Sequence, residues 1–115
     1  MTKAIFNFGE YGLDNFEISG HSGYANYGSD IVCSGISTAV FTTLNLLDKM
    51  YPEYINIIQD EKKGYIKCEF SFDYQAGTKT QFLAMIIQNL IDVLSNIERD
   101  YPKNLKVIIN DEKLK

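Results

Sequence analysis

The chain has 115 residues, of which 45% are hydrophobic and 23% are charged, and this fits one domain, residues 1–115, with a core of its own. The formal net charge is -4 and no basic stripe follows the chain, which argues against a protein that binds nucleic acid through its phosphates. The apolar runs are too short to span a membrane, and no basic leader precedes an apolar signal core. We therefore expect a soluble, cytoplasmic protein.

The chain begins with two predicted strands, residues 3–8 and 15–19, which form a hairpin. In both strands apolar and polar side chains alternate, as they do when one face of a sheet is buried. Residues 20–29 follow, with three glycines and no aliphatic side chain larger than alanine. This composition predicts a loop.

A helix is predicted from Asp30 onward, because apolar residues then recur on one face at about 100 degrees per residue. Ser29 or Asp30 is the expected N-cap, and Pro52 ends the helix. Strands at residues 54–59 and 65–72 form a second predicted hairpin around a polar turn that ends in glycine.

The last predicted elements are a helix over residues 78–100 and a strand over residues 106–110. Leucine and isoleucine are spaced three and four apart along the helix, and Pro102 follows its end. The order of elements is therefore ββα-ββα-β. It predicts an α+β fold, a two-layer sandwich in which a mainly antiparallel sheet carries two helices on one face.

The sequence contains one histidine, His21, which stands where the second strand ends and the glycine-rich loop begins. Cys33 is expected in the first turn of the next helix, where free backbone N–H groups and the helix dipole favour a thiolate. The loop between them can fold back and place the imidazole beside the sulfur as a base. The pair is a candidate catalytic dyad. The sequence is equally compatible with His21 as an ordinary surface histidine and Cys33 as a small apolar residue.

Three further residues bear on this candidate site. Asp30 is expected to cap the helix or to orient His21, since a carboxylate beside Cys33 would oppose thiolate formation. Ser37 lies one turn beyond Cys33 and either hydrogen-bonds the site or bonds its own helix. Cys68 falls in the inward row of its strand, where burial keeps a thiol neutral, so we expect a structural role and no disulfide.

Spacing argues against two other kinds of site. Gly23 and Gly28 are separated as in a phosphate-binding Walker A loop, but Ser29 and Asp30 stand where lysine and a hydroxyl residue are required. One histidine and two dispersed cysteines do not supply the three or four ligands of a structural zinc site. We expect neither a metal nor a cofactor.

The sequence Gly-His-Ser-Gly-Tyr-Ala at residues 20–25, followed by Gly-Ser-Asp-Ile-Val-Cys at residues 28–33 and by Ser37, resembles the ribosomal-processing cysteine protease family, called Prp. The rest of the chain is similar to the family in length and in the order of its elements. Two departures are Ser34-Gly35, in place of a pair of alanines, and Ser22, where alanine is common in the family.

The resemblance implies a cysteine endopeptidase in which Cys33 is the nucleophile and His21 is the general base and then the acid. The family removes the N-terminal extension of the twenty-seventh protein of the large ribosomal subunit, by cutting after two phenylalanines, and it acts as a homodimer. Asp30 and Ser37 match positions of the family motif near the dyad.

Two mechanistic expectations follow from this interpretation. The oxyanion formed during the reaction needs fixed donors, and the backbone N–H groups at the start of the helix are the candidates, that of Cys33 among them. Gly20, Gly23 and Gly28 are the expected hinges of a loop that covers the site and excludes water until substrate moves it.

Other classes of function stay open on the sequence alone. A non-catalytic, ribosome-associated assembly factor would use the loop and the helix face as a binding surface, and a thiol acyl transferase would use the same dyad. An unreactive Cys33 would favour the binding factor. The helix edge that bears Phe41 and Leu44 is either a dimer contact or lies beneath the first hairpin.

Overall fold

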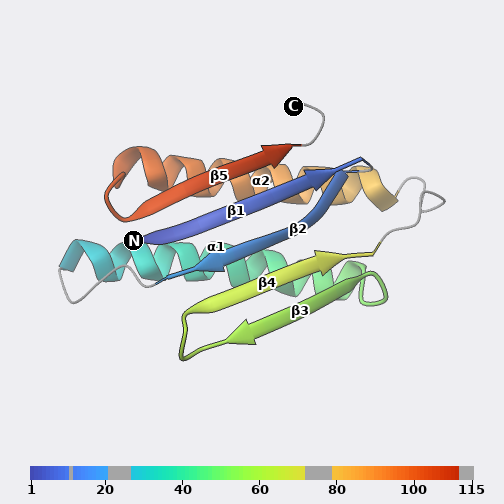
Figure 1. Cartoon of the computed structure of the whole chain (residues 1–115), viewed down its shortest axis with the longest axis horizontal. Coiled ribbons are helices and arrows are strands. Elements are labelled where there is room, and N and C mark those ends of the chain that lie inside the picture. The colour runs from blue at the N-terminus through green and yellow to red at the C-terminus, as the bar shows by residue number, and fades with distance from the viewer. Residues whose placement is uncertain (11, 21–26, 72–78, 112–115) are drawn as a thin grey trace.

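The structure, a computed structural model, describes residues 1–10, 12–20, 27–71 and 79–111, with the backbone alone at residues 27–30, 79 and 80. Five strands form one sheet, and both helices lie behind it in Figure 1. The predicted two-layer α+β fold is confirmed. In chain order the elements are β1 (Thr2–Gly9), β2 (Gly12–Ser19), α1 (Tyr27–Met50), β3 (Ile55–Asp60), β4 (Tyr65–Phe70), α2 (Lys79–Asp100) and β5 (Leu105–Asp111).

The strand order across the sheet is β3-β4-β2-β1-β5. Both predicted hairpins form, β1 with β2 and β3 with β4, and an antiparallel pairing of β2 with β4 joins them. The register aligns Ala4 with Ile18 and Ile18 with Ile66, so the inward-facing rows of the two hairpins continue into each other. β5 returns after α2 to pair with β1 in parallel, an arrangement that needs a helical crossover.

The core lies between the sheet and the helices. α1 and α2 each turn one apolar stripe toward the sheet, as their helical spacing predicts. From Ile31 to Met50, α1 is also long and apolar enough to cross a membrane, a test that the core helix of a soluble protein passes equally. Its buried stripe consists of Val32, Ile36, Val40, Leu44 and Leu47. In the core this stripe meets Leu83, Ile87, Leu90 and Leu94 of α2, and Phe6, Phe16 and Cys68 of the sheet.

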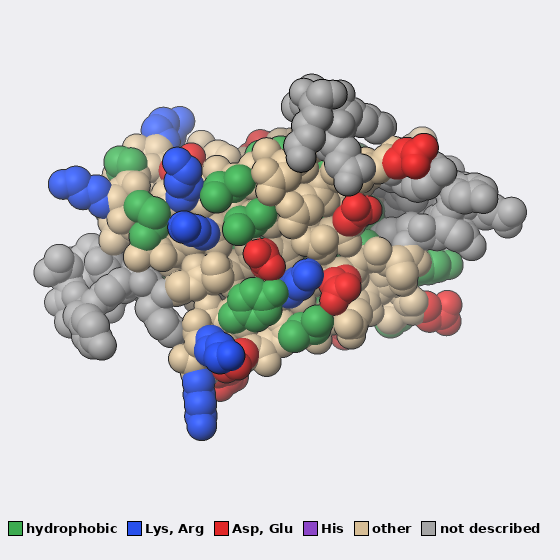
Figure 2. Space-filling view, viewed as in Figure 1, with side chains coloured by type: hydrophobic (Ala, Val, Ile, Leu, Met, Phe, Trp, Pro, Cys, Tyr) green, Lys and Arg blue, Asp and Glu red, His purple; other side chains and the backbone are tan. Residues whose placement is uncertain are grey.

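The other face of the sheet is open and polar. Figure 2 shows basic and acidic side chains spread over this face, with apolar ones between them. Three asparagines form a ladder across neighbouring strands: Asn110 Nδ2 donates to Asn7 Oδ1 at 2.9 Å, and Asn7 Nδ2 donates to Asn15 Oδ1 at 2.8 Å. The alternation in the strands thus marks one packed face and one hydrated face, as predicted.

α1 begins at Tyr27, three residues before the predicted start. The prediction that Ser29 or Asp30 is the N-cap, and that the loop extends to residue 29, is therefore wrong. The physical reason is that the apolar stripe begins only at Val32, so periodicity detects the part of the helix that packs on the sheet and not the turn before it.

Candidate active site

Cys33 lies in the second turn of α1, on the side of the helix near the β3 edge of the sheet. Its side chain is half-buried, and neither cysteine forms a disulfide. Ser37 and Phe41 follow at intervals of four residues, so the three side chains share one stripe along the helix. All three line a cavity of about 340 Å³, within the size range of small ligand sites. A half-buried thiol thus stands in the wall of a cavity that can receive a side chain.

The opposite wall of this cavity comes from the β3–β4 hairpin. Gln59 and Asp60 stand at the end of β3, and Glu61 and Gly64 belong to the turn that follows. Asp60 and Glu61 are the charged side chains among the described residues of the lining, so one rim is acidic. Most of the remaining wall is apolar and is built by Ile18, Ile36, Val40 and Ile66.

Gly20 borders the same cavity at the point where the chain leaves β2, directly before His21. Its φ is +96°, a conformation that residues with a Cβ rarely adopt. Its N–H donates to Gly64 O at 3.0 Å, and a Cβ added to it would lie only 2.5 Å from Met1 O. Gly20 is therefore held from both sides. This position requires glycine, and its role as a hinge stays a prediction.

The position of Cys33 in α1 changes the expected source of oxyanion stabilisation. In a helix that begins at Tyr27, only about the first four N–H groups lack a partner within the helix. The N–H of Cys33 lies beyond them, so the prediction that it is a free donor in the first turn is wrong. Ser37 and Gln59 also line the cavity, and their hydroxyl and amide groups are able to donate hydrogen bonds.

Cys68 contrasts with Cys33 in its surroundings. It is fully buried under the sheet, and burial, with a smaller contribution from the nearby Glu69 carboxylate, raises the pKa of its thiol to about 12. A thiol with this pKa stays neutral near pH 7 and is a poor nucleophile. The structural role predicted for Cys68 fits this environment, and Cys33 is the thiol that a substrate can reach.

The structure brings part of the predicted site together. Cys33, Ser37 and Gly20 border one cavity. His21 and Gly23 lie outside the described residues, so the dyad with Cys33 stays a prediction.

Two other predicted site residues, Asp30 and Gly28, belong to the first turn of α1. Gly28 is thus a helical residue, contrary to its predicted place in a loop. Of the proposed dimer contact, Phe41 is 48% exposed at the cavity, whereas Leu44 is buried in the core and cannot contribute.

Sequence reasoning missed the contribution of the second hairpin. Residues 60–64 were expected to be only a polar turn, yet Asp60 and Glu61 form a rim of the cavity beside the candidate nucleophile. They arrive there because β4 pairs with β2, which brings the turn next to Gly20. The sequence carries no local signal for this pairing, since it joins strands about 50 residues apart.

The fold is shared with solved bacterial structures. One is SMU.848 from Streptococcus mutans, with a TM-score of 0.81 at 24% identity, covering 97% of this chain and 96% of that one. Another is the ribosomal processing protease Prp from S. aureus in complex with a substrate peptide, with a TM-score of 0.79 at 22% identity, covering 96% of this chain and 100% of that one. At these identities the match concerns the fold.

The comparison of sequences is more specific. The ribosomal processing cysteine protease Prp of Bacillus subtilis (strain 168) is 35% identical over 101 residues, which are 86% of this chain and 88% of that protein. The protein of the same name from Staphylococcus aureus (strain Mu50) is 27% identical over 78% of this chain and 80% of its own length. The family model for cysteine protease Prp matches residues 1–106. The family model matches nearly the whole chain, and a thiol lies at a cavity: the chain belongs to the cysteine protease Prp family.

Proposed function

We propose that this protease removes the N-terminal extension of the twenty-seventh protein of the large ribosomal subunit, with Cys33 as nucleophile and His21 as its base. The observation that carries the proposal is the half-buried Cys33 thiol in the wall of a cavity of about 340 Å³, in a chain of this family. A cavity with an apolar base suits the phenylalanine side chains that precede the cleavage point implied by the resemblance.

The proposed reaction has two stages. His21 takes the proton of the Cys33 thiol, and the sulfur attacks the carbonyl carbon of the scissile peptide bond. The imidazolium then gives its proton to the departing amine, which leaves an acyl-enzyme and the mature protein. Water, deprotonated by His21, attacks the carbonyl carbon of the thioester, and the C–S bond breaks. The extension leaves with a new carboxyl group, and the imidazolium returns the proton to the Cys33 sulfur. Ser37 and Gln59, whose side chains line the cavity, are the proposed donors to the oxyanion in both stages.

The proposal extends to the setting in which the protease works. Asp30 is assigned a supporting role near the dyad, because its position matches the family motif. The enzyme is proposed to act in the cytoplasm as a homodimer, on a ribosomal protein precursor, without a metal, a membrane or direct contact with nucleic acid. A formal net charge of -4 favours a brief encounter with a basic ribosomal protein.

Mass spectrometry of a peptide that spans the extended N-terminus tests the function. Wild type, Cys33→Ala, His21→Ala and Cys68→Ala are incubated with the peptide under the same conditions. We expect one cut after the paired phenylalanines with wild type and with Cys68→Ala, the matched loss of a thiol outside the cavity. Cys33→Ala and His21→Ala are expected to leave the peptide intact.

Each other outcome points to a different error. Cleavage by His21→Ala at the wild-type rate would show that His21 is not the base and would contradict the dyad. An intact peptide with a wild type whose Cys33 reacts quickly with iodoacetamide would contradict the assigned substrate, whereas an intact peptide and an unreactive Cys33 would favour a binding factor.

A further inference from the structure

The two edges of the sheet are not equivalent. β5 forms one edge, and there the N–H of Val107 donates to Glu98 Oε2 of α2 at 2.7 Å. A helix side chain thus occupies a backbone donor that would otherwise be open to another strand. β3 forms the opposite edge, where Asn56, Ile57, Ile58 and Gln59 are all exposed. This edge is open to a further strand along these four residues.

The direction of the backbone groups of β3 follows from one hydrogen bond and the register. The N–H of Ser71 donates to Tyr54 O at 2.8 Å, so these two residues form a hydrogen-bonded pair at the end of the ladder. Such pairs alternate along antiparallel strands. The residues next in alternation, Ile55, Ile57 and Gln59, therefore turn their N–H and C=O groups away from β4 and outward.

The other side of β4 gives the same alternation independently. The N–H of Gly20 donates to Gly64 O, which makes the even-numbered residues of β4 the partners of β2. Its odd-numbered residues, such as Lys67 opposite Ile58, must then bond β3. The outward direction of Ile57 and Gln59 is thus fixed from both sides of β4.

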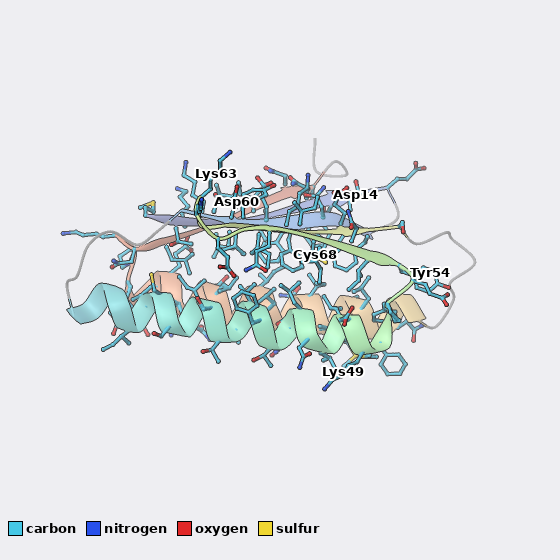
Figure 3. All side chains as sticks on the ribbon, turned by 90° about the horizontal axis from the view of Figure 1, so that it is seen from below. Asp14, Lys49, Tyr54, Asp60, Lys63 and Cys68 are labelled. Atoms are coloured by element: carbon cyan, nitrogen blue, oxygen red, sulfur yellow. The ribbon has the colours of Figure 1, made fainter. Side chains whose placement is uncertain are left out.

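The open edge leads directly to Cys33. β3 runs above α1 from Tyr54 toward Asp60 in Figure 3, and Gln59 and Asp60 line the cavity that contains the thiol. Ile57 stands opposite the buried Cys68 in the register, so its side chain is on the helix side of the sheet and remains 38% exposed. Ile57 and Gln59 therefore share this face of the strand, and Gln59 borders the cavity.

We propose that the substrate binds as a sixth strand on the edge of β3, with its backbone paired to Ile57 and Gln59 and its scissile carbonyl delivered to Cys33. The occupant is an extended peptide, since only a backbone with donors and acceptors at strand spacing satisfies both outward groups of each residue. Alternate side chains of the peptide point toward α1, where Phe41 and the apolar base of the cavity receive them. The inference rests on the proposed function and gives its binding mode.

Residue-resolved amide hydrogen exchange tests this mode without altering the strand. The Cys33→Ala variant is mixed with the extended peptide until about nine-tenths of the protein is occupied, and exchange is followed by NMR. We expect the amides of Ile57 and Gln59 to exchange about tenfold more slowly, the limit set by that occupancy. The amide of Ile109, on the β5 edge, is the matched control and is expected to keep its rate.

The outcomes separate this inference from the function on which it rests. Peptide bound, with unchanged exchange at Ile57 and Gln59, overturns the added strand and leaves the protease intact. Equal slowing at Ile109 also overturns it, because the effect would then be global. No binding to Cys33→Ala and no cleavage by wild type would contradict the proposed function itself.

A pair of variants gives a second test through kinetics. Ile57→Pro removes the outward N–H and the isoleucine side chain, whereas Ile57→Ala removes most of the side chain and keeps the N–H. An edge strand tolerates proline where the N–H faces solvent. We expect KM for Ile57→Pro to be about fivefold above that of Ile57→Ala, the factor given by one hydrogen bond of roughly 1 kcal/mol. Equal KM values in two folded variants would contradict the proposal.

Discussion

The two cysteines differ because one lies at a cavity and the other lies under the sheet. Folding raises the pKa of the Cys68 thiol from its ordinary value of 9.0 to about 12, chiefly because burial removes water from the charged form. The folded protein therefore binds this proton more tightly than the unfolded chain does. This contribution to stability is complete below pH 9 and is lost as the pH rises toward 12.

We expect Cys68→Ala to flatten this part of the pH dependence. By pH 10.5 the wild type should lose about 1 to 2 kcal/mol more of its free energy of unfolding, relative to pH 8, than Cys68→Ala does. Tyrosines that titrate in this range are present in both proteins and cancel in the difference. Urea unfolding at pH 8 and pH 10.5 measures the loss of free energy of unfolding in each protein. An equal loss in the two proteins would show that the Cys68 pKa is not raised.

Gly20 and Gly12 make a matched pair, since both have a positive φ. Gly12 has a φ of +119° and no described atom within 4 Å of an added Cβ, whereas a Cβ on Gly20 would collide with Met1 O. Alanine at either position carries the conformational strain, about 1 to 2 kcal/mol, but only Gly20→Ala adds the collision. We expect Gly20→Ala to unfold at a lower temperature than Gly12→Ala.

Turnover should separate the two glycine variants further. Because Gly20 fixes the point from which the chain continues to His21, we expect Gly20→Ala to lower kcat and Gly12→Ala to leave it near the wild-type value. Intact mass should first confirm that Met1 is present in each protein. Equal melting temperatures and equal kcat values would contradict both the collision and a role of Gly20 in placing His21.

Glu98 connects α2 with the β5 edge. Its carboxylate accepts a charge-assisted hydrogen bond from the N–H of Val107 and is half-buried. Glu98→Ala is expected to lower the free energy of unfolding by about 1 to 2 kcal/mol, and Glu98→Gln by less, since an amide oxygen still accepts. Glu53→Ala, a change of equal charge at an exposed site, should cost under about 0.5 kcal/mol. Denaturant titration compares the three, and equal losses would assign the effect to charge alone.

The elements could be predicted from the sequence because their signals are local. Alternation marked β1, β2 and β4, and helical spacing marked α1 and α2. The parallel pairing of β1 with β5 left no such signal, because it depends on the path of the chain across α2.

The candidate site could be predicted only in part, for the same reason. Cys33 was identified from its type and its place near a helix start, and its neighbour Ser37 from helical spacing. Gln59 and Glu61 were missed, because they reach the cavity through strand pairings that no nearby residue records. The start of α1 was misplaced because its first turn carries Gly28 and Ser29, residues that are as common in loops as at helix ends.

At the scale of the whole molecule, a two-layer fold leaves two outer faces, and they differ in character. The open face of the sheet carries charges and the asparagine ladder. The outer face of the helices carries no charged residue of α1 between residues 31 and 47. Large apolar side chains are exposed on that layer outside the cavity, namely Ile31, Leu46, Phe82 and Met85. In the proposed homodimer, contact through the helical layer would remove the most apolar surface from water.

Sedimentation equilibrium at micromolar concentration tests this assignment. We expect wild type at twice the 13.1 kDa mass of the chain, because covering the apolar helical face removes hydrocarbon from water. Met85, which is 70% exposed, lies on the outer side of α2, so Met85→Glu should shift the equilibrium to the single chain. Ile58→Glu is the matched control, since Ile58 is 42% exposed and lies on the open face of the sheet. A wild type of 13.1 kDa would contradict the dimer, and dissociation by Ile58→Glu alone would move the contact to the sheet.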